Sequence, residues 1–352
     1  MGAEVLAEVL ERDPLVAYGW WADGFLSAVY LLSRARGGSV LPAEPPRPGQ
    51  AWLESLAAAS RGHGGLVLAS TGWSMADVDR LAPMVLAPVV VVDTHWSRGR
   101  SLRSNVFVYN PAPRGDARGY WPSTALYVAT LLPEPHPLLA AAGVVAVLGE
   151  AALGNRLYQN MMVRARLDPR GDYQLAHDCA MQAYGLVAQG DPRVHGEAPR
   201  SIVEAERLDP CKAILRDALL TGLRAEAEVG LSDVRLDEQE PRAGFRVYYA
   251  RGWGRHALIV ARRLASKGAR VAVGYEDESS GYRAVCAWSM KRGDPPLAEL
   301  LGQLRSRGLR ARGMFQGVAN FVCAEPVDSL DKALSTIVEE FENRFSSSHA
   351  ET

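Results

Sequence analysis

Residues 16–32 read VAYGWWADGFLSAVYLL, and this stretch decides the fold. Its first residues, 16–18, are apolar and predict a short buried strand, which the chain leaves at Gly19. Asp23 stands beside a glycine just after the turn, and apolar residues then recur at helical spacing over 24–36. A strand, an acidic turn and a helix N-terminus in this order are typical of α/β phosphohydrolases, which hold divalent metal over a phosphate.

Strands and helices continue to alternate further along the chain. GLVLA at 65–69 predicts a second buried strand that ends at Ser70, and VVVV at 89–92 predicts a third that ends at Asp93. The segment 41–50, LPAEPPRPGQ, is rich in proline and predicts a loop. Because strands alternate with helices, we expect an α/β fold with a parallel sheet that carries helices on both faces.

The length of 352 residues is enough for two domains, each with its own core. We expect a parallel-sheet domain over 1–195 and connecting helices over 196–243, with an acidic, proline-broken hinge at 236–243. The part 244–345 begins with a strand and a helix of its own and predicts a smaller α/β domain. The tail 346–352 is expected to be disordered.

Composition limits the classes of function. Hydrophobic residues make up 48% of the chain and charged residues 22%, as in ordinary globular proteins. The formal net charge of -1 gives no overall basic character, so any contact with nucleic acid must depend on a local patch. The apolar runs 81–92 and 138–148 are too short to cross a bilayer, and no signal peptide is visible. We therefore expect a cytoplasmic protein that does not bind membranes.

The four cysteines lie far apart in the sequence, at Cys179, Cys211, Cys286 and Cys323. No Cys-x-x-Cys pair is present, which argues against a zinc site. We expect all of them to be reduced and mostly buried thiols of an intracellular protein.

The stretch around Asp23 resembles the first motif of the DHH phosphoesterase superfamily, which includes the RecJ nucleases. That motif reads His-x-Asp-x-Asp-Gly-x-x-Ser-Ala. In this chain the same frame reads Gly19-x-Trp21-x-Asp23-Gly24-x-x-Ser27-Ala28. The resemblance implies that the scaffold is kept while two of the three ligand side chains of this motif are replaced.

The resemblance extends over nearly the whole chain. The run 105–132 resembles the Asn-Pro and Tyr-Pro-x-(Ser/Thr)-Ala segments of RecJ-like proteins, and Asn155 and Arg156 match an Asn-Arg pair further on. The order of elements after residue 244 resembles the DHHA1 domain that follows DHH catalytic domains. There, Ser289-Met290-Lys291 occupies the position at which relatives carry Ser-x-Arg. Arg312-Gly313-Met314 occupies the position at which they carry Gly-Gly-His.

The resemblance also assigns the positions of the former metal site: Gly19, Trp21, Asp23, Ser70, Asp93, Thr94, His95 and Val147. Only Asp23, Asp93 and His95 keep a strong metal-ligating side chain. A two-metal phosphoesterase needs several such ligands around ions about 3.5–4 Å apart. The sequence therefore indicates a degenerate site without catalytic residues, metal or cofactor.

A degenerate site on this frame resembles the archaeal branch of the cell division control protein 45 family, the RecJ-like subunit of the CMG replicative helicase. The resemblance implies a nucleoid-associated, non-catalytic subunit that binds the GINS complex and the MCM helicase and that contacts single-stranded DNA. The candidate nucleic-acid contacts are Arg98, Arg100, Arg103, Arg251, Arg283, Lys291 and Arg292.

Two other functions stay open at this stage. One is an active manganese-dependent RecJ-like 5'-3' single-strand exonuclease or nano-oligonucleotide phosphoesterase, and the other is an inactive scaffold for an active RecJ paralogue. The retained side chains also have structural interpretations. Asp23 is expected to cap its own helix, while Asp93 and His95 are expected to hydrogen-bond each other or the main chain. Trp20 and Trp21 are expected to fill the vacated cavity or to meet a partner.

Overall fold

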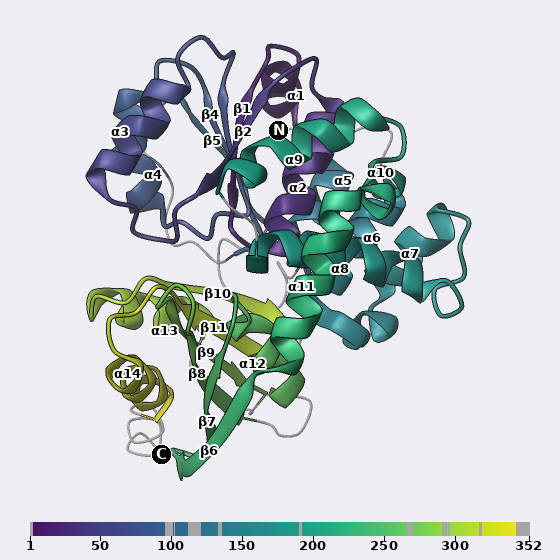
Figure 1. Ribbon diagram of the computed structural model, residues 1–352. Coiled ribbons are helices and arrows are strands. Elements are labelled where there is room, and N and C mark those ends of the chain that lie inside the picture. The colour runs from purple at the N-terminus through teal and green to yellow at the C-terminus, as the bar shows by residue number, and fades with distance from the viewer. Residues whose placement is uncertain are drawn as a thin grey trace, which may run out of the picture. The chain divides into compact units, whose positions relative to one another are not determined.

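The computed structural model describes residues 3–95, 101, 103–111, 121–132, 136–189, 192–265, 270–290, 294, 296–316 and 319–342 (Figure 1). These residues form two compact units. The first holds the described residues of Met1–Thr94, Gly99–Pro111 and Trp121–Glu226, and the second holds His95 and those from Ala227 onward. The predicted disordered tail, 346–352, lies outside the described residues.

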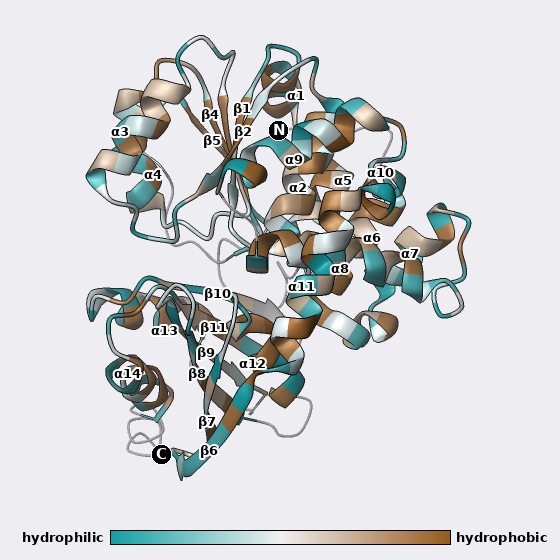
Figure 2. Cartoon of the chain, viewed as in Figure 1, coloured by the Kyte–Doolittle hydropathy of each residue, from teal (hydrophilic) through white to brown (hydrophobic). Residues whose placement is uncertain are grey.

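The first unit is built on a parallel sheet of five strands in the order β2-β1-β3-β4-β5. The strands are β1 (Leu15–Gly19), β2 (Ser39–Ala43), β3 (Leu66–Ala69), β4 (Val89–Val92) and β5 (Val106–Tyr109). All residues of β1, β3 and β4 are buried, and Figure 2 shows the apolar character of this sheet. Strands buried on both faces are nearly continuous apolar runs, which is why the predicted parallel sheet is confirmed.

Part of the predicted proline-rich loop is strand β2, which includes Pro42. This strand pairs only with β1 and forms an edge of the sheet. A proline is tolerated on an edge strand because the side facing away from the sheet needs no N–H donor.

Helices cover both faces of this sheet. In Figure 1, α3 and α4 lie on one side of it and α2 and α9 on the other. The helices up to the unit boundary are α1 (Glu4–Leu10), α2 (Ala22–Arg34), α3 (Gln50–Ala59), α4 (Met75–Leu81), α5 (Thr124–Leu131), α6 (Pro137–Leu148), α7 (Arg156–Arg164), α8 (Tyr173–Gln189), α9 (Pro192–Ala205) and α10 (Pro210–Arg216), with η1 (Ala82–Met84) and η3 (Gly149–Gly154). The helix α11 (Ala218–Ser232) crosses the unit boundary along the chain.

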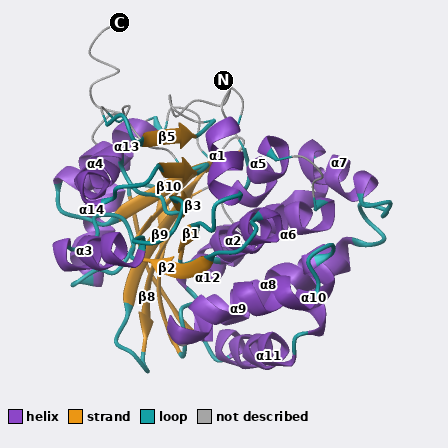
Figure 3. Ribbon diagram, turned by 90° about the horizontal axis from the view of Figure 1, so that it is seen from above, coloured by secondary structure: helices purple, strands orange, loops and turns teal. Residues whose placement is uncertain are grey.

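The helix α2 is buried at nearly every position because it is covered by other helices as well as by the sheet. It packs against α5, α6, α8 and α9, and Figure 3 shows α2, α6 and α8 beside one another. Among the described residues, one stretch, Pro137–Gly154, is long and apolar enough to cross a membrane, with a mean hydropathy of 1.8. Its helix α6 contacts α2, α5, α7 and α8, which is the position of a core helix.

The second unit is built on a mixed sheet of six strands in the order β10-β11-β9-β8-β7-β6, in which only β7 and β8 are parallel. The strands are β6 (Arg235–Arg242), β7 (Phe245–Gly252), β8 (Arg270–Asp277), β9 (Arg283–Ser289), β10 (Ala311–Gln316) and β11 (Ala319–Ala324). The helices that complete this unit are α12 (Ala257–Ala265), α13 (Leu297–Ser306) and α14 (Leu330–Glu342). The last helix, α14, buries one apolar stripe at Leu334, Ile337, Val338 and Phe341.

The expected hinge at 236–243 is instead almost entirely strand β6, paired antiparallel with β7. Its register shifts between Gln239 and Arg242, around Pro241. Nearly every residue of β6 is exposed. Charges, a proline and a bulge are the features that protect an edge strand from pairing with another chain, so the acidic composition marks a sheet edge here.

The expectation that all four cysteines are reduced is wrong for one pair, because Cys286 and Cys323 form a disulfide. The two residues stand directly opposite each other on β9 and β11, a pairing of strands that local sequence does not indicate. Cys179 and Cys211 are free and buried, and burial raises the pKa of the Cys211 thiol well above its ordinary value.

Candidate functional site

The first sheet reverses its strand order at β1, because β2 lies on one side of it and β3 on the other. In open α/β sheets, ligands bind outside the carboxyl ends of the strands at such a reversal. Here these ends are Gly19 of β1 and Ser70, which follows β3. Asp23 lies in the first turn of α2, directly after β1. The sequence therefore places its candidate residues where the fold places a ligand.

The Asp23 carboxylate is buried, with 2% of the residue exposed, and both of its oxygens accept hydrogen bonds. Its Oδ1 accepts from the Ser123 hydroxyl at 2.7 Å and from the Ala125 N–H at 3.1 Å. Its Oδ2 accepts from the Thr124 N–H at 2.8 Å and from the Ser70 hydroxyl at 3.2 Å. An ionised carboxylate offers about four lone-pair sites, so these four donors use its accepting capacity.

The expectation that Asp23 caps its own helix is not what the structure shows. The N-cap residue of α2 is Trp21, which makes no side-chain capping bond, and Asp23 lies inside the helix. The carboxylate instead binds the first amides of α5, about 100 residues later in the sequence. Ser123 is the N-cap residue of α5, and its hydroxyl accepts from the Leu126 N–H at 3.1 Å. Two capping oxygens, one local and one distant, thus serve the same helix end.

Three hydroxyls continue the network from the carboxylate to the end of β4. The Ser70 hydroxyl accepts from the Trp21 indole N–H at 2.9 Å and from the Thr124 hydroxyl at 3.1 Å. The Thr124 hydroxyl accepts from the Thr94 N–H at 3.3 Å, and the two threonine hydroxyls lie 3.0 Å apart. All of these residues are buried. A buried network whose members have partners is rigid, whereas leaving one donor unpaired is costly.

The Trp21 side chain occupies the space next to Gly19. A Cβ atom at Gly19 would overlap the Ser70 carbonyl oxygen and the Trp21 indole ring. A ligand side chain therefore cannot be placed at Gly19 unless both neighbours move. Trp21 is 6% exposed, and its N–H is bonded inside the site, so its position agrees with the predicted filling of a cavity.

The neighbouring tryptophan has a different environment. The Trp20 ring packs edge-on against His195 of α9, with ring centroids 4.9 Å apart. His195 is itself held by Tyr18 of β1, whose hydroxyl lies 3.0 Å from the imidazole Nδ1. Burial raises the pKa of Tyr18 well above its ordinary value, so its hydroxyl keeps its proton in this core contact. The two adjacent tryptophans thus serve separate parts of the unit.

The other positions of the former metal site, Asp93, His95 and Val147, each have surroundings of their own. Asp93 Oδ2 accepts from the Gly72 N–H at 2.7 Å, which is the predicted main-chain contact at a strand end. His95 is buried and belongs to the second unit. Val147 is half-buried on α6, one turn beyond Gly143. A Cβ atom at Gly143 would lie 3.1 Å from Asp23 Oδ1, so Gly143 is the residue of α6 that faces the carboxylate.

The residues present do not fit a two-metal centre. The lone pairs of Asp23 are used by protein donors, and a cation there would also face the positive N-terminal end of α5. Gly19, Trp21 and Val147 carry no metal ligand. Across the part of the chain that the structure describes, no group of three or more His, Cys, Asp or Glu residues could hold a metal ion.

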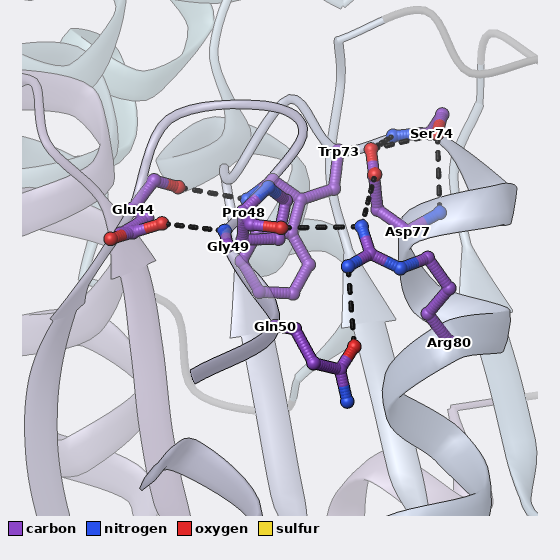
Figure 4. Close-up of polar contacts among 8 residues, drawn as sticks. All are labelled: Glu44, Pro48, Gly49, Gln50, Trp73, Ser74, Asp77 and Arg80. Atoms are coloured by element: carbon purple, nitrogen blue, oxygen red, sulfur yellow. Dashed lines mark hydrogen bonds and ion pairs between the residues drawn. The ribbon is translucent and has the colours of Figure 1, made fainter. Parts of the chain in front are cut away.

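The loops after β2 and β3 are tied together beside this site (Figure 4). The Trp73 indole N–H donates to the Glu44 carbonyl at 2.8 Å, and the Gly49 N–H donates to the Glu44 carboxylate at 3.0 Å. Arg80 of α4 donates to the Pro48 carbonyl at 3.2 Å. These contacts fasten the proline-rich loop to Trp73 and to Arg80 of α4 through two main-chain carbonyls and the Glu44 carboxylate.

The candidate nucleic-acid contacts are only partly described. Arg103 is exposed in the first unit. In the second unit, Arg251 of β7 and Arg283 of β9 stand in register on either side of Glu276 of β8. Arg283 pairs with Glu276 at 2.7 Å and Arg251 lies 4.0 Å from it, so one carboxylate offsets part of their charge. The others, Arg98, Arg100, Lys291 and Arg292, lie outside the described residues.

Two further positions of the C-terminal motifs are occupied by structural contacts. The Arg312 guanidinium pairs with Glu325, and Glu325 also accepts from the Tyr282 hydroxyl. The Ser289 hydroxyl accepts from Arg270 at 3.1 Å and donates to Asp294. These side chains stabilise the second sheet.

Sequence reasoning missed the residues that hold Asp23, namely Ser123, Thr124 and Gly143. A signal for Ser123 exists, because a serine directly before a helical run is a typical N-cap. No local signal shows that the same helix end also receives a carboxylate from α2.

No family model and no curated protein matches this chain. Among solved structures it is similar to exonuclease RecJ bound to manganese, with 16% identity over 98% of this chain and 95% of that one, at a TM-score of 0.51. Other similar structures are a DHH domain, with 13% identity, coverage of 96% and 87% and a TM-score of 0.49, and Cdc45 from Entamoeba histolytica, with 9% identity, coverage of 94% and 95% and a TM-score of 0.46. At these identities the likeness concerns the fold alone, and the chain has an α/β fold like that of RecJ.

Proposed function

We propose that this chain is a non-catalytic RecJ-like replication factor, a structural subunit of a replicative helicase that binds the GINS complex and the MCM ring. One observation supports the loss of catalysis above the others: the Asp23 carboxylate is buried and accepts four hydrogen bonds from protein donors. The likeness of the fold to that of RecJ supports the motif resemblance that assigns Asp23 to a metal-ligand position.

Two-metal phosphoester hydrolysis needs carboxylate lone pairs directed at ions about 3.5–4 Å apart, where they stabilise the attacking and the leaving oxygen. Amide and hydroxyl protons take those lone pairs here. The Trp21 ring occupies the space beside Gly19, where the RecJ-like frame has its first ligand. Hydrolysis would require both the ring and the first turn of α5 to move, which is the physical basis for proposing a pseudoenzyme.

The resemblance of the ordered motifs supports GINS and MCM as partners. Reconstitution tests this part of the proposal. The purified full chain, mixed with purified GINS and MCM from the same organism, is expected to elute with them from a gel-filtration column. Each component run alone is the control. Separate elution, together with recovery of an active nuclease when the tagged chain is isolated from native extract, would favour a scaffold for a RecJ paralogue.

Loss of catalysis has its own test. The chain, incubated with Mn²⁺ and 5'-labelled single-stranded DNA, is expected to release no mononucleotides above the background of the Asp93→Ala variant. Manganese-dependent release by the wild-type chain that Asp93→Ala abolishes would establish an exonuclease with a rearranged site. Full activity in both would indicate a contaminating nuclease, and the assay would be repeated on material purified further.

Contact with single-stranded DNA is a further part of this proposal, supported by the exposure of Arg103 and Arg251. Phosphate contacts weaken as salt rises, because bound counterions are released. An Arg103→Ala/Arg251→Ala variant is expected to bind a fluorescent oligonucleotide more weakly and with a smaller salt dependence. Equal affinity and equal salt dependence in the variant would place any DNA contact elsewhere.

A further inference from the structure

We infer that Asp23 is a built-in anionic ligand: its carboxylate occupies an anion-binding site at the N-terminus of α5 and fixes that helix at the carboxyl edge of the first sheet without any metal. This inference goes beyond the proposed function, because it assigns a role to Asp23 that depends neither on a partner nor on nucleic acid.

The donors around the carboxylate have the arrangement of an anion site. Three of them come from consecutive residues, the Ser123 hydroxyl and the N–H groups of Thr124 and Ala125. The fourth is the Ser70 hydroxyl, which comes from the end of β3. Consecutive donors at a helix start form the concave site that binds phosphate, sulfate or carboxylate in many proteins. Here an anion is present at this site, and it belongs to the chain itself.

The charge of Asp23 agrees with this role. Aligned peptide dipoles give a helix N-terminus a partial positive charge of about half an elementary charge. Asp23 stands in the first turn of α2 and binds the first turn of α5, so two helix N-termini face one carboxylate. A divalent cation placed there would meet the same positive ends and would find the lone pairs taken. The geometry at this place thus favours an anion over a divalent cation.

Close packing encloses the carboxylate. A Cβ atom at Gly143 would lie 2.6 Å from the Ser123 hydroxyl and 3.1 Å from Asp23 Oδ1, so α6 passes as near as a glycine permits. Removal of the carboxylate would therefore leave a small polar space lined by donors that have lost their acceptor. Buried donors without an acceptor are costly, and a small anion can restore their partner.

Chemical rescue tests the inference. The Asp23→Ala variant of the full chain is expected to melt at a clearly lower temperature than the wild type. Sodium formate is expected to restore a large part of that loss, whereas sodium chloride at equal ionic strength restores little. The wild-type chain, whose site is filled, is expected to gain nothing specific from formate. Equal melting of variant and wild type, or a variant that formate leaves unchanged, would overturn the inference.

A matched control tests whether formate stabilises the protein in general. Asp77 is another buried carboxylate at a helix start, but it belongs to a local capping box with Ser74 on α4. Asp77→Ala is expected to lose stability and to gain no more from formate than the wild type. Equal rescue of both variants would show that formate acts on the whole protein and would count against the inference.

Two measurements keep the test decisive if Asp23→Ala does not fold. Asp23→Asn keeps the size but turns an amide NH₂ toward donors, so it is expected to melt below the wild type and to be insensitive to formate. Titration of the wild-type chain with Mn²⁺ is expected to leave its melting temperature unchanged. A rise with Mn²⁺ that Asp23→Asn lacks would make Asp23 a metal ligand and overturn the inference. Neither result alters the reconstitution with GINS and MCM, so the partners of the proposed function are tested separately from this inference.

Discussion

The two sheets of this molecule satisfy their buried charges in different ways. At the edge of the first sheet, the Asp23 carboxylate accepts from neutral groups, two amides and two hydroxyls. In the second sheet, buried Arg312 pairs with Glu325, and buried Arg270 pairs with Asp294.

The difference determines which substitutions of buried charged residues each region tolerates. In the first, the carboxylate faces the fixed dipoles of two amides and two hydroxyls. In the second, each of these ions faces an ion of opposite charge. Loss of either partner leaves an uncompensated buried charge, while loss of both does not.

Trp21→Asp is expected to have the largest effect, because it removes a buried indole and places a carboxylate beside Asp23. Replacing a buried tryptophan by alanine costs about 3–5 kcal/mol, and an unpaired buried charge adds to that. The free energy of unfolding, measured by urea denaturation, should fall by more than the alanine cost. No manganese-dependent nuclease activity should appear.

Trp20→Ala is the matched control for that experiment, because its ring packs on His195 and not in the site. It should cost less than Trp21→Asp. Unchanged melting of Trp21→Asp would contradict the assigned position of Trp21, and a gain of activity would show that the ring alone had closed a working site.

Glu325→Ala is expected to lower the free energy of unfolding by about 3–5 kcal/mol, the usual cost of breaking a buried ion pair on one side. Arg312 and the Tyr282 hydroxyl would both lose their acceptor. The double variant Arg312→Met/Glu325→Leu is expected to cost less than the single one. A double variant that is as unstable as the sum of its parts would show that the pair contributes more than it costs.

Reduction of the Cys286–Cys323 disulfide is expected to destabilise only the second unit. The bridge closes a loop of sequence separation 37, and a bridge of this span stabilises by about 3–4 kcal/mol in the chain-entropy estimate. Urea denaturation followed by unit-specific proteolysis, with and without dithiothreitol, measures the effect. Equal loss in the first unit, whose Cys179 and Cys211 are free, would contradict it.

Acid should weaken the second unit through His256, with the smallest effect of the series. Burial lowers the pKa of this imidazole, and this outweighs its hydrogen bond with the Trp253 main chain and the charge of Asp277. A lowered pKa in the folded state means that the unfolded chain binds a proton first. The stabilisation is therefore complete above the ordinary histidine pKa, about 6.5, and is lost as the pH falls from there toward the folded value.

The His256→Gln variant is the comparison for this pH dependence. When the pH falls from about 7.5 to about 5, the range in which a histidine usually titrates, the free energy of unfolding of the wild-type chain should fall more than that of the variant. Parallel curves would show that the pKa of His256 is the same in the folded and the unfolded chain.

Much of the first unit follows from the sequence. The runs at β3 and β4 are apolar throughout, and only a strand covered on both faces tolerates such a run, so they predict a parallel sheet. Asp23, Ser70 and Asp93 follow strands that the sequence already reveals, and carboxyl ends of parallel strands lie at one edge. The location of the candidate site was therefore predictable from residue order alone.

The side-chain and main-chain partners of those residues could not be predicted from residue order. Asp23 binds amides that follow it by about 100 residues, and no local pattern says which helix N-terminus meets which carboxylate. Four cysteines can form a single bridge in six ways, and only the register of β9 and β11 brings Cys286 to Cys323. The acidic stretch of β6 has the composition of a linker, and its pairing with β7 depends on a neighbour.

By itself, then, the sequence determined the order of strands and helices and the absence of ligand side chains at Gly19, Trp21 and Val147, because periodicity and residue chemistry are local properties. Only the tertiary structure decided what became of the remaining carboxylate. Hydrogen bonds between distant segments depend on how helices pack, and packing joined Asp23 to the first turn of α5.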